Sequence, residues 1–339
     1  MIRPFGITNI PQVWDLQRSS AVLAIEHALT HPQEPLWIAL TAPWPWAGVG
    51  VATYVLDARG ENEPMAGFVQ LMKRTARPEA DLLYLAPALP TASTSNAVGE
   101  EIWRRLLAHG CLAAAGHGLQ RVFASIRDHG PEPACLKEAG FSLYTRETIY
   151  RLATAPPASE QLTGFRPQLP QDSWALQRLY TRSTPRLVQS AEGAMTGEVG
   201  SPPLSWWEPD RWQGVVWEPA GEVRGVVQVH IGRAGHWLRI WGTNMLAARE
   251  LRALIDQGLR SIATTRSRGA RKPLPVYATV RDYEIGLSGA LTGLGFAPYV
   301  DRARSVKHTP PAVRESLPAT LPALDGRQEV PVRSQPHRP

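Results

Sequence analysis

The chain has 339 residues, of which 43% are hydrophobic and 19% charged, so it can bury substantial cores and is not of the disordered class. At about 150 residues per domain, this length predicts two compact domains. The 31 prolines and 28 glycines exclude a coiled coil, and the two cysteines exclude a disulfide framework or a cysteine-based zinc module. The net charge of +6 is scattered, which argues against a nucleic-acid partner.

Residues 35–56 carry no charged side chain, and a stretch of that length can span a bilayer. Pro43 and Pro45 interrupt it, so we expect a buried loop followed by a strand and no membrane partner. The N-terminus lacks the apolar core of a signal peptide. Together with the two cysteines, this predicts a cytoplasmic protein.

Four segments of the first half recur in the second half in the same order. Residues 14–18 return as 174–178, residues 67–71 as 225–229, residues 122–128 as 276–282, and Gly140-Phe141 as Gly295-Phe296. Such a series predicts a duplicated domain. The small, proline-bearing stretch after residue 153 predicts a boundary. We therefore divide the chain into an N-terminal domain (1–153), a linker (154–164), a C-terminal domain (165–308) and a disordered, proline-rich tail (309–339).

The periodicity of the first copy predicts an alternation of helices and strands. The first element is an amphipathic helix that starts at Pro11. A β-hairpin follows, then a strand, a long helix, a strand, a short helix and a last strand. The predicted ranges are 51–56 and 66–72 for the hairpin, then 82–85, 102–111, 121–126, 134–138 and 141–152.

The second copy gives the same order of elements. Its predicted ranges are 174–180, 212–217, 222–231, 236–241, 251–262, 275–280, 287–294 and a final strand from Ala297. Each copy is therefore an α+β domain of about 150 residues, with a mixed, mostly antiparallel sheet flanked by helices.

This order resembles the GCN5-related N-acetyltransferase (GNAT) superfamily. The resemblance rests on an Arg-Pro opening in each copy (Arg3-Pro4, Arg166-Pro167), the central hairpin, and the short helix that ends in Gly-Phe. Leu85-Ala86-Pro87 is similar to the Val-x-Pro step of the family's fourth strand. The resemblance implies a tandem N-acetyltransferase that takes an acyl group from acetyl-CoA.

Members of the family hold the donor's pyrophosphate in a glycine-rich loop that opens a helix, where backbone amides and the helix dipole face the phosphates. The first copy has Ser95-Asn96-Ala97-Val98-Gly99 at that place, and only Gly99 and Ala97 match. We expect these residues and the amide of Leu85, as the oxyanion donor, to form the donor site. A capped structural helix is the alternative.

The corresponding loop of the second copy, residues 242–250, has no glycine pair, so we expect no donor there. The prediction for the first copy fails if the cleft between its splayed strands is blocked by its own side chains.

The family's usual general acid, a tyrosine five residues before the Phe of Gly-Phe, is replaced by Leu136 and Leu291. The asparagine found earlier in that motif is replaced by His129 and Glu284. His129 and Tyr144 are weak candidates for the catalytic proton transfer. Solvation of His129 and packing of Tyr144 are the alternatives. The histidines lack a metal-ligand spacing, so no metal is expected.

Our first hypothesis is therefore an N-acetyltransferase whose N-terminal copy binds acetyl-CoA and whose acceptor is a small-molecule amine, a protein N-terminus or a lysine. The second is an inactive GNAT-like binding module that uses its tryptophan clusters for a small ligand or a protein partner. A third is a transferase whose donor is a carrier larger than CoA. The oligomeric state is left open.

Overall fold

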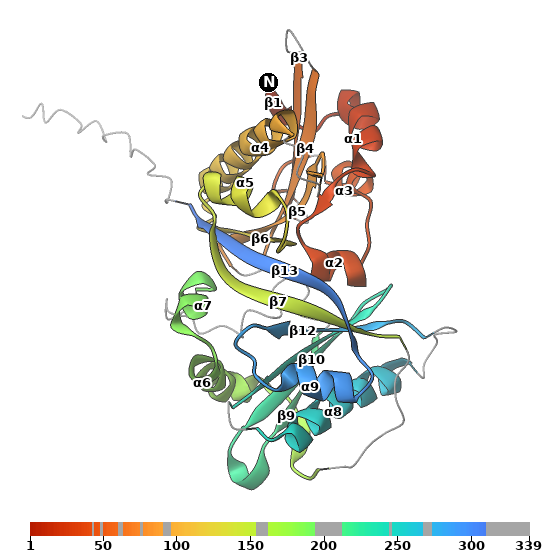
Figure 1. The fold of residues 1–339 in the computed structure, drawn as a ribbon, viewed down its shortest axis with the longest axis vertical. Helices are drawn as coiled ribbons and strands as arrows, with labels where there is room; N and C mark the ends of the chain where they lie inside the picture. Colours follow the sequence, from red (N-terminus) through yellow and green to blue (C-terminus); the bar gives the residue numbers. More distant parts are fainter. Residues whose placement is uncertain are drawn as a thin grey trace, which may run out of the picture.

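The computed structural model describes residues 1–309 with the exception of 43, 48–49, 60–63, 75–76, 91–95, 154–161, 194–211, 244–245 and 267–272. Most of the linker and the tail beyond Thr309 lie outside the described residues. The protein is elongated, and its two halves lie one above the other in Figure 1, with two long strands crossing between them.

The first half contains the predicted elements, with longer strands than the periodicity indicated. They are β1 (Ile2–Pro4), α1 (Ile10–Gln17), β2 (Ala21–Val22), α2 (Ile25–Thr30), α3 (Pro35–Thr41), β3 (Val51–Arg59), β4 (Pro64–Lys73), β5 (Glu79–Ala86), α4 (Ala97–Gly116), β6 (Arg121–Arg127), α5 (Glu132–Glu138) and β7 (Ser142–Leu152). The expected loop after Pro35 is instead helix α3, because Pro35 takes the first helical position, where its missing N–H is no loss.

The second half follows the same order. It contains β8 (Phe165–Pro167), α6 (Ser173–Ser183), α7 (Arg186–Ala191), β9 (Trp212–Trp217), β10 (Gly225–Ile231), β11 (His236–Gly242), α8 (Ala248–Arg266), β12 (Val276–Arg281), α9 (Leu287–Gly293) and β13 (Ala297–His308). Both copies close the short helix in the same way. Gly140 and Gly295 have positive φ angles of 83° and 87°, a conformation in which glycine has no steric penalty. The amides of Phe141 and Phe296 then bond back to the carbonyls of Leu136 and Leu291.

All strands belong to one sheet of 13 strands, in the order β1-β3-β4-β5-β6-β13-β7-β12-β11-β10-β9-β8, with β2 attached to β5. Most neighbours are antiparallel. The exceptions are β5–β6 and β11–β12, which are parallel and occupy the same place in the two halves. The fold is thus mixed α and β with a mostly antiparallel sheet, as predicted.

The last strands of the two halves are exchanged. Strand β13 runs antiparallel to β6 of the first half, with Arg302 opposite Arg127, and β7 runs antiparallel to β12 of the second half, with Glu147 opposite Arg281. The two exchanged strands also pair with each other and form the crossing seen in Figure 1. The sequence division at residues 153 and 165 stays a prediction about where each copy begins and ends.

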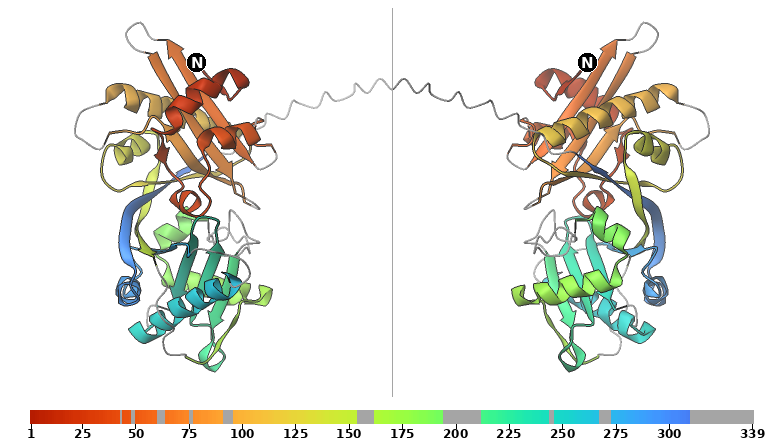
Figure 2. Two further views of the ribbon diagram at one scale, coloured as in Figure 1. Left: turned by 90° about the vertical axis from the view of Figure 1, so that its right-hand side faces the viewer. Right: turned by 90° about the vertical axis from the view of Figure 1, so that its left-hand side faces the viewer.

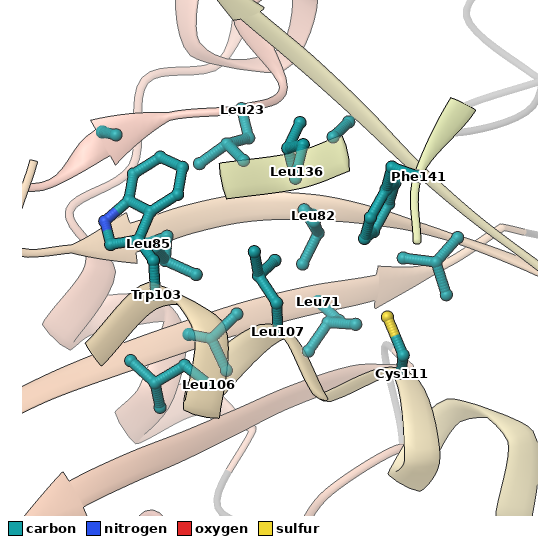
Figure 3. Close-up of a cluster of buried hydrophobic side chains, with 14 of the residues drawn as sticks. Leu23, Leu71, Leu82, Leu85, Trp103, Leu106, Leu107, Cys111, Leu136 and Phe141 are labelled. Carbon is teal, nitrogen blue, oxygen red and sulfur yellow. The ribbon is translucent and has the colours of Figure 1, made fainter. Parts of the chain in front are cut away.

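Each half has a hydrophobic core between its long helix and the sheet, and further buried clusters lie on the other face. In the first half, Trp103 and Leu107 of α4 pack on Leu71 and Leu82 of the strands (Figure 3). In the second half, Leu254 and other residues of α8 pack on β10–β12 in the same way. Figure 2 shows α8 lying along one side of its sheet. Among the described helices, none has both the length and the apolar character needed to cross a membrane.

Candidate functional site

The two parallel strand pairs are the places where the sheet opens. In the first half the β5–β6 ladder covers only Glu79–Asp81 and Arg121–Phe123. In the second half the β11–β12 ladder covers only His236–Leu238 and Val276–Ala278. Beyond these pairs the neighbouring strands diverge, so each half has one V-shaped opening between two parallel strands.

The opening of the first half is filled by the protein's own chain. The amide of Leu23 donates to the carbonyl of Leu83 on β5 at 2.9 Å, and the carbonyl of Leu23 accepts from the amide of Ser125 on β6 at 2.9 Å. Residues Ala21 and Val22 pair with Leu85 and Tyr84. Leu23 is 2% exposed and belongs to the core. Residues 21–23 therefore form a plug that bridges the two strands.

The plug exists because α1 ends early. The hydroxyls of Ser19 and Ser20 donate to the carbonyls of Leu16 and Gln17, and such local side-chain bonds favour the end of a helix. The chain then extends into β2. The counterpart segment in the second half begins Leu179-Tyr180 in place of the two serines, and there α6 continues to Ser183.

The predicted donor residues at the start of α4 form a capped helix. The side-chain oxygen of Asn96 accepts from the amide of Gly99 at 3.0 Å. A Cβ on Gly99 would lie 2.6 Å from the Asn96 amide nitrogen, so glycine is required here by the cap itself. Ala97 is exposed and Val98 partly buried, whereas Ser95 lies outside the described residues. The Gly99 amide, which a phosphate would use, is thus already engaged.

The remaining predicted site residues are not brought together. Leu85 is fully buried between Ala21 and Val69. His129 is exposed. Tyr144 is buried, lies edge-on to Phe123 at 6.3 Å, and burial raises its pKa to about 12. These positions support the packing alternative for Tyr144. The assignment of a donor site to the first copy therefore has no geometric support in the described residues.

The opening of the second half contains a cavity of about 110 Å³. Its walls come from the end of β11, the start of α8, the end of α6, and the turn between β12 and α9. The lining residues are Ser183, Ile240, Trp241, Gly242, Thr243, Leu246, Leu251, Tyr283, Glu284, Ile285 and Leu287. The same place in the fold that is plugged in the first half is thus hollow in the second.

Glu284 is the titratable group of this cavity that stands out. One carboxyl oxygen, Oε2, accepts from the amide of Arg281 at 2.8 Å. The other, Oε1, is buried and has no hydrogen-bond partner among the described residues. Burial raises the pKa of Glu284, and the charges of Arg239 and Arg281 only partly oppose that shift. A carboxyl group of this kind takes up and releases a proton nearer to neutral pH than an exposed one.

Tyr283 lies beside Glu284 in the cavity wall. Its hydroxyl accepts from the Arg281 guanidinium at 2.8 Å, and burial raises its pKa. Arg281 in turn forms a buried ion pair with Glu192 at 2.5 Å, and Glu192 accepts from the Tyr180 hydroxyl. This chain of bonds fixes the turn that carries Glu284.

Sequence reasoning noted Glu284 but gave it no role. It stands where the resemblance expects an asparagine, and the second copy was expected to be inert. The available signal was the replacement of a neutral amide by a carboxyl group at that position. Among the described residues, the structure has no cluster of three or more His, Cys, Asp or Glu side chains arranged for a metal ion.

A scan against models of protein families finds no match, and a search of the curated proteins finds none either. Solved structures do match. A GCN5-related N-acetyltransferase from Sphaerobacter thermophilus has 14% identity and a TM-score of 0.51, with 92% of this chain and 96% of that chain covered. The protein has the GNAT fold.

Two further solved structures resemble this GNAT fold more weakly. A tandem GNAT protein from the clavulanic acid biosynthesis pathway has 14% identity and a TM-score of 0.48, covering 92% of this chain and 99% of that chain. A putative acetyltransferase from Pyrococcus horikoshii has 12% identity and a TM-score of 0.44, covering 91% and 89%. The expected GNAT fold is confirmed by the first of the three structures, and these two add no argument of their own.

Acetyl-CoA, the donor that the GNAT fold implies, fits the two halves differently. In the first half the plug already uses the backbone edges of β5 and β6 that face the opening. In the second half the ladder to β12 ends at Leu238, so the facing edge of β11 borders the cavity from Ile240 onward. Among the described residues, the strand edges at the opening are therefore bridged by the chain in the first half and border a cavity in the second.

Proposed function

We propose that the protein is an acyltransferase that moves an acyl group from acetyl-CoA to an amine, with the donor held in the opening of the second half. The observation that carries this proposal is the cavity between the ends of β11 and β12, lined by a carboxyl group of raised pKa. It replaces our initial placement of the donor in the first half. The acceptor class, a small-molecule amine or a protein amine in the cytoplasm, stays a prediction.

Glu284 is the proposed general base. An amine is mostly protonated near neutral pH and must lose a proton to attack a thioester carbonyl, the group that the donor supplies. The Oε1 atom of Glu284 is buried and unbonded among the described residues, and we assign it the uptake of that proton, while the Arg281 amide holds the other oxygen in place. Tyr283 is positioned by Arg281 in the same wall of the cavity. We assign to Tyr283 the return of a proton to the leaving thiolate, because Leu291, at the position of the family's usual tyrosine, has no proton to donate.

A matched pair of variants tests which half holds the donor. Ala97 and Ala248 are each the first residue of their helix, α4 or α8, and both are exposed. An added carboxylate there suits the helix dipole, so folding is preserved, but it repels a nearby pyrophosphate. We expect acetyl-CoA titrated calorimetrically to bind Ala248→Asp about tenfold more weakly, a loss of about 1.4 kcal/mol, and Ala97→Asp like the wild type.

If Ala97→Asp weakened the binding of acetyl-CoA and Ala248→Asp did not, the donor would bind in the first half. Absence of saturable binding to the wild type at millimolar acetyl-CoA would favour the second candidate, an inactive binding module. Two observations favour that candidate: the glycine pair is missing from residues 242–250, and leucine replaces the usual tyrosine at position 291. Release of free thiol from acetyl-CoA with a panel of primary amines then decides between the two.

A further inference from the structure

Arg239 is a buried cation without a hydrogen-bond partner. It lies on β11, and its side chain is among the largest that are fully buried, with 1% exposure. All three guanidinium nitrogens are buried and have no partner among the described residues. The other buried arginines of this region differ, because Arg281 and Arg304 are each bonded to a glutamate.

Two further buried groups, on the strands that flank β11, have no hydrogen-bond partner among the described residues. On β10, Gln228 is its register partner, and the oxygen Oε1 of Gln228 is buried without a bond. On β12, the hydroxyl of Thr279 is buried without a bond. Trp237 and Tyr277 are in ring contact at 6.1 Å, and side chains alternate along strands. Arg239 and Thr279, each two residues further on, therefore share that face.

The carboxylates around Arg239 are engaged elsewhere. Its charge helps to lower the pKa values of Glu26 and Glu192, which burial alone would raise. Glu26 bonds to Arg304 at 2.9 Å, and Glu192 bonds to Arg281 and to Tyr180. These acids favour a positive charge at Arg239 but give its five N–H donors no acceptor among the described residues.

We infer that Arg239 anchors a binding site for a carboxylate or phosphate group, with Thr279 as a second donor and Gln228 as an acceptor for a neighbouring N–H or O–H of the same ligand. A buried, unbonded guanidinium costs stability. An oxyanion satisfies it with two parallel charge-assisted bonds. The ligand class is thus a small molecule that carries an oxyanion next to an amine or hydroxyl group.

Arg239 is not among the residues that line the cavity, but it lies on β11, the strand that forms one of the cavity walls. Trp241, two residues further along β11, lines that cavity together with Tyr283 and Glu284, and the charge of Arg239 acts on both of the latter. We therefore assign the molecule bound at Arg239 the role of acyl acceptor, with its anionic group at Arg239 and its amine toward Glu284. That last step rests on the proposed function, whereas the anion site itself does not.

The test uses the full chain without acetyl-CoA, so its outcome is independent of donor binding. Melting temperatures are followed in titrations with sodium succinate and with sodium phosphate, at ionic strength held constant with sodium chloride. We expect a saturable rise with one of the two anions, and the anion that acts identifies the group as carboxylate or phosphate. In Arg239→Met the apparent Kd rises at least tenfold, while Arg104→Met, a change at an exposed arginine, leaves it unchanged.

The ligand-free variants provide a second readout. Because Arg239→Met removes an unbonded buried charge, its melting temperature exceeds that of the wild type, whereas Arg304→Met, which strands Glu26 and Glu147, melts lower. A rise with neither anion, or a response that persists in Arg239→Met, overturns the inference. So does a ligand-free Arg239→Met that melts as low as Arg304→Met, since Arg239 is then a structural charge.

Discussion

The openings of the two halves have the same place in the sheet and opposite contents. In the first half, residues 21–23 bond to both diverging strands, and in the second half a cavity of about 110 Å³ lies there. The difference begins with Ser19 and Ser20, which end α1, whereas Leu179 and Tyr180 continue α6. The two openings thus differ together with the point at which the preceding helix ends, Gln17 in the first half and Ser183 in the second.

The largest expected effect concerns the general base. Glu284→Gln keeps the bond to the Arg281 amide but cannot take a proton. We expect the rate of acetyl-CoA turnover to fall by about 10²- to 10⁴-fold, measured as free thiol released with an amine acceptor. The matched change in the first half, His129→Gln, leaves the rate unchanged. An unaltered rate in Glu284→Gln excludes Glu284 as the base.

The same variant has a pH signature in stability. The pKa of Glu284 is raised by burial above the 4.5 of a free carboxyl group, so the folded state binds the proton more tightly than the unfolded state. Its contribution to stability is complete below pH 4.5 and is lost as the pH rises through the raised value. Urea unfolding across this range should show that loss in the wild type and not in Glu284→Gln. If the free energy of unfolding changed with pH in the same way in both proteins, the raised pKa of Glu284 would be contradicted.

A third prediction compares the arginines that end β12 and β6. Arg281 is buried and pairs with the buried Glu192, whereas the Arg127 side chain is 39% exposed beside Glu132. Removal of Arg281 strands a buried carboxylate, so Arg281→Ala should lower the free energy of unfolding by about 3–5 kcal/mol. Arg127→Ala should cost less, about 1–3 kcal/mol, because the buried Glu132 keeps its bond from the Arg127 backbone amide. Denaturant titration of both variants checks this, and equal costs would mean that the two strand ends are equivalent.

The plug can be tested by its core residue. Leu23→Ala should lower the free energy of unfolding by about 2–4 kcal/mol through lost burial and a cavity. Because we propose that the donor binds in the second half, the affinity for acetyl-CoA should stay within twofold of the wild type. Denaturant titration and calorimetry give the two values. A clear gain in affinity would show that the plug competes with the donor.

The smallest effect concerns a feature that the two halves share. Gly140→Ala and Gly295→Ala each place a side chain at a positive φ, with no contact to the new Cβ closer than 3.6 Å. Strain alone should therefore cost about 1 kcal/mol at each site. Thermal unfolding should give similar values for both. Unequal costs would show that the two Gly-Phe turns differ in their surroundings.

Much of this fold was predictable because its signals are local. Hydrophobic periodicity placed the helices and strands, and the recurrence of residues 122–128 as 276–282 revealed the duplication. The strand exchange was not predictable, since β7 and β13 have the same pattern and either could pair with β6. The course of residues 21–23 also depends on contacts with Leu83 and Ser125, far away in sequence.

The donor site was predicted less well than the fold. The prediction followed the family's donor-loop motif, which the first copy matches better than the second. Gly99 matched the donor loop, yet its amide serves the Asn96 cap. Glu284 departs from the motif, and only the packing around it shows that one of its oxygens is buried and free. Which copy keeps a pocket is decided by neighbouring segments rather than by the motif itself.

The exchange of the last strands ties the maturation of the first half to the end of the chain. Strand β6 meets its partner β13 only after residues 297–308 have been synthesised. During translation, β6 therefore cannot pair with β13 until the whole second half has emerged from the ribosome. In a nascent chain halted at the linker, β6 lacks β13, so its edge either pairs with β7 or is exposed to other strands. The two copies therefore mature together and cannot be separated into independent modules by cutting the linker.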